Sequence, residues 1–66
     1  MWVFAEVVDR SGAVLARAEG ELTKDGDMAE ISRRALDRFH QSFPGQSVLS
    51  ASGAEFILRF GRAPKA

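Results

Sequence analysis

The chain offers few residues that could carry out a reaction. It contains one histidine and no cysteine, which excludes thiolate chemistry and cysteine-containing zinc sites. His40 has no carboxylate four residues away on either side, because Leu36 and Pro44 hold those positions. A lone histidine makes a poor metal site, so a histidine on the surface of a helix is the favoured interpretation.

The other candidate groups for catalysis fit structural roles better. Ser11 and Ser52 stand next to glycines, in sequences typical of turns. Asp25 and Asp27 flank Gly26 just before a predicted helix, which favours turn and capping roles over paired catalytic carboxylates or calcium ligands. No glycine opens a phosphate-binding motif. We therefore expect no enzyme activity, no metal and no cofactor.

Charge is distributed unevenly along a chain whose net charge is zero. Residues 1–30 carry seven acidic and three basic side chains, net −4, whereas residues 31–66 carry six basic and two acidic ones, net +4. The basic side chains that could contact phosphates are Arg33, Arg34, Arg38, Arg62 and Lys65. Glu30 and Asp37 share the exposed helix face and can pair with those arginines. Nucleic-acid binding is therefore an alternative function, which we rank below the binding of another protein.

The spacing of apolar residues predicts the elements that hold these groups. Residues 2–8 are rich in β-branched and aromatic types and end at a turn-forming cluster, which predicts a strand and its hairpin loop. Residues 13–22 alternate between apolar and polar types, which predicts a second strand with one solvated face. Residues 47–51 and 54–60 flank Ser52-Gly53, which fits a two-residue hairpin turn between two further strands.

An amphipathic helix is predicted between the two pairs of strands. Asp27, with Glu30 three residues later, resembles a capping box, and the helix ends before Pro44 because proline cannot continue the hydrogen-bond ladder. The apolar side chains on one side of this helix are Met28, Ile31, Ala35, Leu36, Phe39 and Phe43. The predicted fold is α+β in the order β-β-α-β-β, with the helix on one face of a four-stranded, mainly antiparallel sheet.

We expect one domain over residues 1–60, followed by a flexible basic tail over residues 61–66. The charged second strand and the serine-rich third strand are typical of sheet edges, which favours the strand order 2-1-4-3. Two separate hairpins that cross the helix fit the sequence as well. The N-terminal residues include neither a basic segment nor a long apolar stretch, so we expect no membrane span and a cytoplasmic location.

The two faces of the sheet are predicted from strand pairing across the Ser52-Gly53 turn. The residues expected to face the helix are Val3, Ala5, Val7, Val14, Ala16, Ala18, Leu49, Ala51, Phe56, Leu58 and Phe60. The opposite face then carries apolar anchors among charged side chains, and these anchors are Trp2, Phe4, Leu15, Val48 and Ile57. A contiguous apolar patch with aromatic residues is typical of a protein interface.

The simplest partner for this second face is another copy of the chain, because two-fold homodimers are the commonest assembly. We therefore expect a non-enzymatic, regulatory protein–protein interaction module that forms a homodimer. A second possible function is that of an inhibitor or adaptor, which would present the same face to a larger protein complex. If the first strand runs in the opposite phase, Trp2 and Phe4 belong to the core and the binding face is lost.

Overall fold

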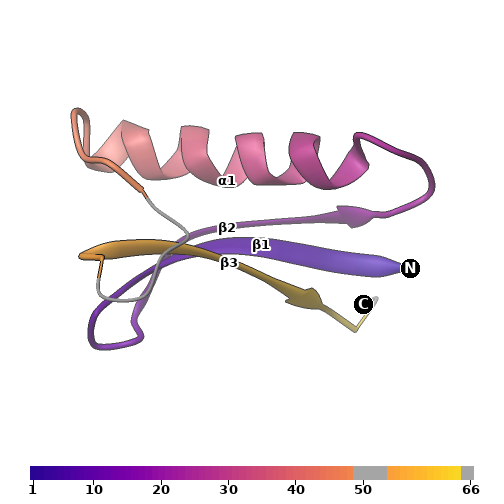
Figure 1. The fold of residues 1–66 in the computed structure, drawn as a ribbon, viewed down its shortest axis with the longest axis horizontal. Coiled ribbons are helices and arrows are strands. Elements are labelled where there is room, and N and C mark those ends of the chain that lie inside the picture. Colours follow the sequence, from indigo (N-terminus) through magenta and orange to yellow (C-terminus); the bar gives the residue numbers. More distant parts are fainter. Residues whose placement is uncertain (49–53, 65–66) are drawn as a thin grey trace.

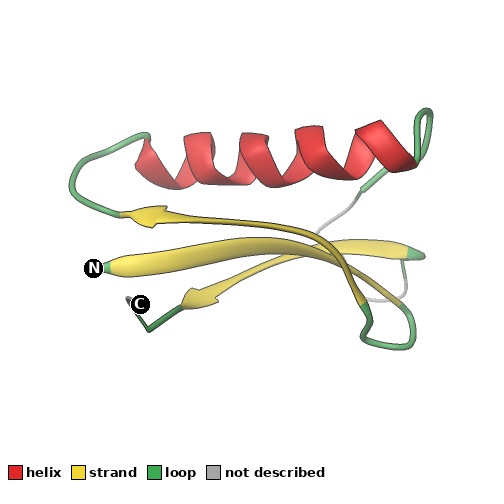
Figure 2. Ribbon diagram, turned by 180° about the vertical axis from the view of Figure 1, so that it is seen from behind, coloured by secondary structure: helices red, strands yellow, loops and turns green. Residues whose placement is uncertain are grey.

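The computed structural model describes residues 1–48 and 54–64 of the chain. Within these residues the elements follow in the order β1 (Trp2–Asp9), β2 (Val14–Glu21), α1 (Asp27–Ser42) and β3 (Phe56–Arg62), as labelled in Figure 1. Figure 2 shows α1 lying along one face of an antiparallel sheet, in which the strand order is β2-β1-β3. No helix in the described part of the chain is both long enough and apolar enough to cross a bilayer.

The α+β class is confirmed, but the four-stranded β-β-α-β-β arrangement is wrong. The sheet formed by the described residues has three strands. Ser47 and Val48, at the start of the predicted third strand, lie in irregular chain, and residues 49–51 lie outside the described residues. Ser47 lacks the β-branched or aromatic side chain that favours a strand. The last strand pairs with β1, as the order 2-1-4-3 requires, and it runs through Arg62, past the expected domain end at residue 60.

The central strand β1 bonds its two neighbours with alternate residues. The amide of Leu22 donates to the carbonyl of Met1 (2.7 Å), and the amide of Ala63 donates to the carbonyl of Trp2 (3.1 Å). Hydrogen-bonded pairs alternate along an antiparallel ladder, so odd residues of β1 bond β2 and even residues bond β3. Backbone groups that point outward therefore belong to residues 17, 19 and 21 of β2 and to residues 56, 58, 60 and 62 of β3.

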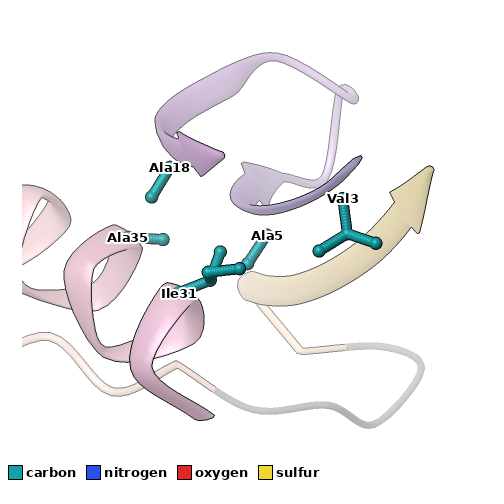
Figure 3. Close-up of a cluster of buried hydrophobic side chains, with 5 residues drawn as sticks. All are labelled: Val3, Ala5, Ala18, Ile31 and Ala35. Carbon is teal, nitrogen blue, oxygen red and sulfur yellow. The ribbon is translucent and has the colours of Figure 1, made fainter. Parts of the chain in front are cut away.

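The core lies between α1 and the half of the sheet formed by β1 and β2. Figure 3 shows Val3, Ala5 and Ala18 meeting Ile31 and Ala35 of the helix. Val3 is 5% exposed and Ala5 is fully buried, so the predicted phase of the first strand is confirmed. The alternative phase, with the aromatic residues of β1 in the core, is wrong. The alanines matter because small side chains let the helix approach the sheet closely.

Aromatic rings join the end of α1 to the start of β3. Phe39 is fully buried, and its ring centroid lies 5.0 Å from that of Phe43 and 5.1 Å from that of Phe56. Rings at these separations interact favourably in offset or tilted arrangements. This cluster is the main contact between the helix and β3.

The start of α1 is held by Asp27 in a way that differs from the predicted capping box. The residue at the N-cap is Gly26, with φ at 94° and no side-chain cap. The Asp27 carboxylate instead accepts hydrogen bonds from the amide (2.8 Å) and hydroxyl (2.9 Å) of Thr23 and from the amide of Lys24 (3.0 Å). These bonds favour the ionised carboxylate, so the bond from the Thr23 amide, followed by that from its hydroxyl, lowers the pKa of Asp27.

A bulge in β2 changes the position of Val14. Val7 pairs with Ala16 and Val8 pairs with Val14, so Leu15 is the extra residue between two pairs. One extra residue moves the side chains before it to the other face of the sheet. The prediction that Val14 belongs to the helix-facing core is therefore wrong, and its side chain is 49% exposed.

Candidate interaction surfaces

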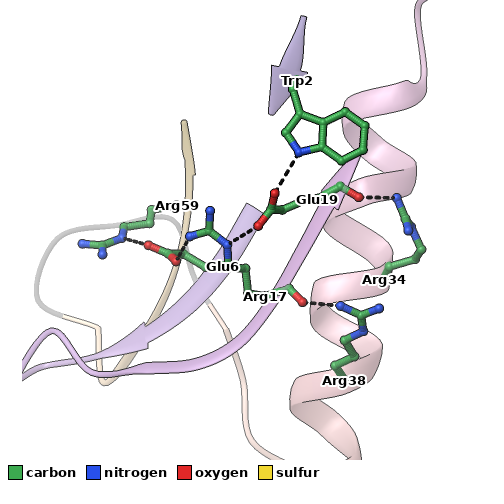
Figure 4. Close-up of polar contacts among 7 residues, drawn as sticks. All are labelled: Trp2, Glu6, Arg17, Glu19, Arg34, Arg38 and Arg59. Atoms are coloured by element: carbon green, nitrogen blue, oxygen red, sulfur yellow. Dashed lines mark hydrogen bonds and ion pairs between the residues drawn. The ribbon is translucent and has the colours of Figure 1, made fainter. Parts of the chain in front are cut away.

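The helix-free face of the sheet carries an ion-pair network centred on Glu6. This residue is 2% exposed, and its carboxylate oxygens accept hydrogen bonds from Arg17 Nη1 (3.0 Å, to Oε2) and from Arg59 Nε (2.6 Å, to Oε1). Arg17 belongs to β2 and Arg59 to β3, so one carboxylate on the middle strand joins both outer strands (Figure 4). Hydrogen bonds of this charge-assisted kind are the strongest that side chains form.

The network extends to Trp2 through Glu19. Arg17 Nε donates to Glu19 Oε2 (3.0 Å), and the indole Nε1 of Trp2 donates to Glu19 Oε1 (2.8 Å). Both bonds favour the carboxylate, so the bond from Trp2, followed by that from Arg17, lowers the pKa of Glu19. The polar end of Trp2 is thus fixed to the neighbouring strand.

Phe4 is packed on two sides. The guanidinium carbon of Arg17 lies 4.1 Å from the centroid of the Phe4 ring, in a cation–π contact. Gly61 is the cross-strand partner of Phe4, and a Cβ atom at Gly61 would lie 2.7 Å from the ring. The ring therefore lies against bare backbone, which a larger residue at position 61 would not allow.

The five predicted anchors of this face have different surroundings. Trp2, Phe4 and Ile57 lie on the helix-free side, where the Glu6 network surrounds the first two. Leu15 occupies the bulge in β2, and Val48 lies in irregular chain after the helix. All five side chains are half-buried. The structure therefore does not bring them together as one strand-borne patch.

Two helix arginines predicted to contact phosphates reach the outer edge of β2. Arg34 Nη2 donates to the carbonyl of Glu19 (3.1 Å), and Arg38 Nη1 donates to the carbonyl of Arg17 (2.5 Å), as Figure 4 shows. Both carbonyls point outward from the sheet, away from β1. These arginines therefore supply donors along an edge where another strand would otherwise pair.

The remaining basic candidates are spread over separate parts of the molecule. Arg33 pairs with Glu30 (2.5 Å) and Asp37 (2.7 Å) on the exposed face of α1. The hydrogen bond from Arg33 lowers the pKa of Glu30. Arg62 is exposed at the end of β3, and Lys65 lies outside the described residues.

The helix leaves β3 largely uncovered. α1 packs against β2 and β1, and its main contact with β3 is the aromatic cluster at Phe56. Phe60 lies on the helix-facing side, opposite Ala5, yet it is 50% exposed. Leu58, two residues earlier, is half-buried against the core. Within the described residues, no hydrogen bond reaches the outward backbone groups of β3.

No family model, curated protein or solved structure matches this chain. Its function must therefore be inferred from its own surfaces. His40 Nε2 lies 3.0 Å from the carbonyl of Gln46, as suits a histidine on the surface of a helix. Among residues 1–48 and 54–64 we find neither a pocket nor a group of three residues of the types that bind metals.

Sequence reasoning missed two features of these surfaces. It assigned Phe60 to the covered core, although a helix about 10 Å across covers only about two strands spaced about 4.8 Å apart. It also missed the burial of Glu6, which lies directly opposite Arg17 on one side and Arg59 on the other. An acid between two arginines at cross-strand positions is a signal that a correct register would have supplied.

Proposed function

We propose that this chain is a protein–protein interaction module that forms a homodimer and carries out no reaction of its own. The observation that supports the proposal is β3, where Phe60 stays 50% exposed beside Leu58 on a part of the sheet that α1 does not cover. An aromatic side chain with apolar neighbours is typical of the centre of a protein interface. A regulatory role and a cytoplasmic location belong to the same proposal.

The β3 surface comprises Phe56, Leu58, Phe60 and the outward backbone groups of β3. It suits association better than the helix-free face does. A partner on the helix-free face would have to remove water from Arg17 and Arg59, whose side chains are 37% and 52% exposed. Burying charged groups costs free energy even when they are paired. A partner on the helix-facing side of β3 meets the apolar side chains of Phe56, Leu58 and Phe60 and a strand edge instead.

Nucleic-acid binding by α1 has weaker support. Arg34 and Arg38 would have to leave the carbonyls of β2 to contact phosphates, and Arg33 would have to leave two carboxylates. Each such exchange gives up an existing hydrogen bond to form a new one. An inhibitor or adaptor role would use the same β3 surface for a foreign protein, and it is separated from self-association by the experiment below.

Sedimentation equilibrium over a wide concentration range tests the proposal, with the native chain and Phe60→Asp compared. We expect a native dimer and a folded, monomeric variant, because an aspartate in an apolar interface must lose its water without a partner. The matched control is Val14→Asp. It places the same charge on β2, at an apolar residue that is exposed to a similar extent (49%). We expect this control to remain a dimer.

Circular dichroism shows whether both variants keep the native fold. A native chain that is monomeric at every concentration contradicts self-association and directs the search to a foreign partner. Dissociation of both variants to the same extent contradicts a role for β3 in particular.

A further inference from the structure

We infer that two copies of the chain pair edge to edge through β3, so that their sheets join into one continuous antiparallel sheet with both helices on the same face. This inference rests on the proposed self-association and specifies its geometry. It starts from the difference between the two edges of the sheet. Arg34 and Arg38 donate to outward carbonyls of β2, whereas the outward groups of β3 have no hydrogen-bond partner among the described residues.

A second copy fits this edge because β3 is complementary to itself. Residues 56, 58 and 60 direct both the amide and the carbonyl outward, and a two-fold rotation presents the same groups at the same spacing. The side chains at these positions all lie on the helix-facing side and are all apolar: Phe56, Leu58 and Phe60. Antiparallel pairing therefore sets apolar side chains against apolar side chains in the strip between the two helices.

Charge and aromatic pairing together select one register among the four whose two-fold axis falls at residues 57–60. An axis at Ile57 places Glu55 opposite Arg59, which is a favourable pair of charges. That axis also sets Phe60 opposite Ala54, so the exposed ring gains no aromatic neighbour. A two-fold axis at Arg59 places two arginines directly opposite each other, and like charges in that position are destabilising.

An axis at Phe60 places Arg62 opposite Leu58 on the helix-facing side, so a charged side chain meets the apolar strip between the two helices. An axis at Leu58 pairs Leu58 with its copy and Phe56 with Phe60, and it places no like charges opposite each other. It also sets Arg59 opposite Ile57, but on the helix-free face, where the Arg59 guanidinium keeps its ion pair with Glu6.

The Leu58-centred register also gives the exposed Phe60 a neighbour. Phe60 of one copy lies directly opposite Phe56 of the other in a hydrogen-bonded pair, and aromatic side chains in directly opposite positions interact favourably. Phe56 already contacts Phe39 and Phe43. The pairing therefore extends this aromatic cluster across the two-fold axis, and the zero net charge of the chain leaves no overall repulsion between copies.

Backbone methylation tests the role of the β3 edge without changing any side chain. In a chemically synthesised full-length chain, an N-methyl group at residue 60 removes one outward donor from each copy and blocks the approach of the partner strand. We expect the dissociation constant, measured by sedimentation equilibrium, to rise at least about tenfold. The matched control carries the N-methyl group at residue 21, whose amide points outward on β2, and we expect its dissociation constant to equal that of the native chain.

Cysteine cross-linking tests the register, because the chain has no cysteine of its own. Two copies of residue 58 face each other in the inferred register, with Cα atoms about 5.5 Å apart, within reach of a disulfide. Two copies of residue 60 are separated by four residues along the strands, about 13 Å. We expect Leu58→Cys to form a covalent dimer on mild oxidation much faster than Phe60→Cys. Faster cross-linking of Phe60→Cys contradicts this register.

The outcomes separate this inference from the proposed function. A monomeric native chain contradicts self-association itself. A native dimer that resists N-methylation at residue 60 contradicts pairing through the β3 edge but leaves self-association standing, as does equal dissociation by methylation at residues 60 and 21. Circular dichroism of each synthetic chain shows that a change in association does not come from unfolding.

Discussion

The two edge strands of the sheet differ in how their outward backbone groups are bonded. At β2, Arg34 and Arg38 reach from the helix to outward carbonyls, and a bulge at Leu15 interrupts the strand. At β3, the described residues supply no such donors, and Phe60 is half exposed. Charged side chains and bulges are the usual means by which proteins protect an edge strand from unwanted pairing. Residues 1–48 and 54–64 therefore protect the β2 edge in this way and supply no comparable protection at the β3 edge.

The difference follows from where α1 lies. The helix packs over β1 and β2, so the arginines on its β2 side are close enough to reach the outer carbonyls of that strand. The same placement takes the helix away from β3. One helix is about as wide as two strands, so its lateral position decides which edge strand its arginines can reach.

Glu6 provides the largest expected effect, because it joins both edges to the central strand. Glu6→Ala removes hydrogen bonds to Arg17 and Arg59, and we expect the free energy of unfolding to fall by about 2–4 kcal/mol. Urea denaturation measures this loss. Glu6→Gln keeps the shape of the side chain and is expected to lose less.

Two single substitutions compare the contributions of the two edge strands to the dimer. Arg59→Met removes the bond between Glu6 and β3, whereas Arg17→Met removes the bond between Glu6 and β2. We expect Arg59→Met to weaken the dimer more than Arg17→Met does. Equal effects of the two changes on the dissociation constant would contradict the difference between the edges.

Removing the helix arginines provides the next largest effect and opens the protected edge. Arg34→Ala with Arg38→Ala exposes the outward carbonyls of β2, and we expect a loss of about 1–2 kcal/mol in the free energy of unfolding. A dimer joined through β3 then carries two open β2 edges, so further copies can add without closure. Sedimentation velocity and light scattering should detect species larger than the dimer.

The control for this experiment is Arg33→Ala with Lys24→Ala. It removes the same charge, but Arg33 pairs with carboxylates on the outer face of α1 rather than with β2. We expect this control to stop at the dimer. A double arginine variant that also stops at the dimer shows that Arg34 and Arg38 do not protect the edge.

The regular elements could be predicted from the sequence because local patterns specify them. The apolar spacing of Ile31, Ala35 and Phe39 and the stop at Pro44 define the helix to within two residues of its observed end. The alternation of Val3 and Ala5 with larger neighbours favours the observed phase of β1, but the sequence left the opposite phase open until the burial of these two residues decided it. Periodicity of this kind predicts secondary structure without any knowledge of tertiary contacts.

The surfaces could not be predicted in the same way, because they depend on contacts between distant residues. The bulge at Leu15 leaves no mark on the pattern of residues 13–22, and it moves Val14 to the other face. The bonds from Arg34 and Arg38 depend on the lateral position of the helix over the sheet. A helical wheel correctly assigns these arginines to the polar side, but it cannot show that this side meets the edge of β2.

The smallest effect that we predict is an acid transition confined to β2. The bond from Trp2 and the pair with Arg17 lower the pKa of Glu19 in the folded chain. A lowered pKa means that Glu19 contributes stability above the ordinary glutamate pKa of about 4.3, and this contribution disappears as the pH falls through the lower pKa of the folded state. Trp2 is the sole tryptophan, so its fluorescence should change in that acid range and not between pH 5 and 7.

The variant Glu19→Gln should abolish this part of the fluorescence change, because its side chain does not titrate. β3 contains no acidic residue between Phe56 and Arg62. We therefore expect the dimer to persist through the Trp2 transition until the chain unfolds, as measured by sedimentation at each pH. If the dimer dissociates together with the fluorescence change, and if Glu19→Gln prevents that dissociation, the interface lies on the β2 side. Glu19 is the group that titrates in this transition, and it belongs to β2.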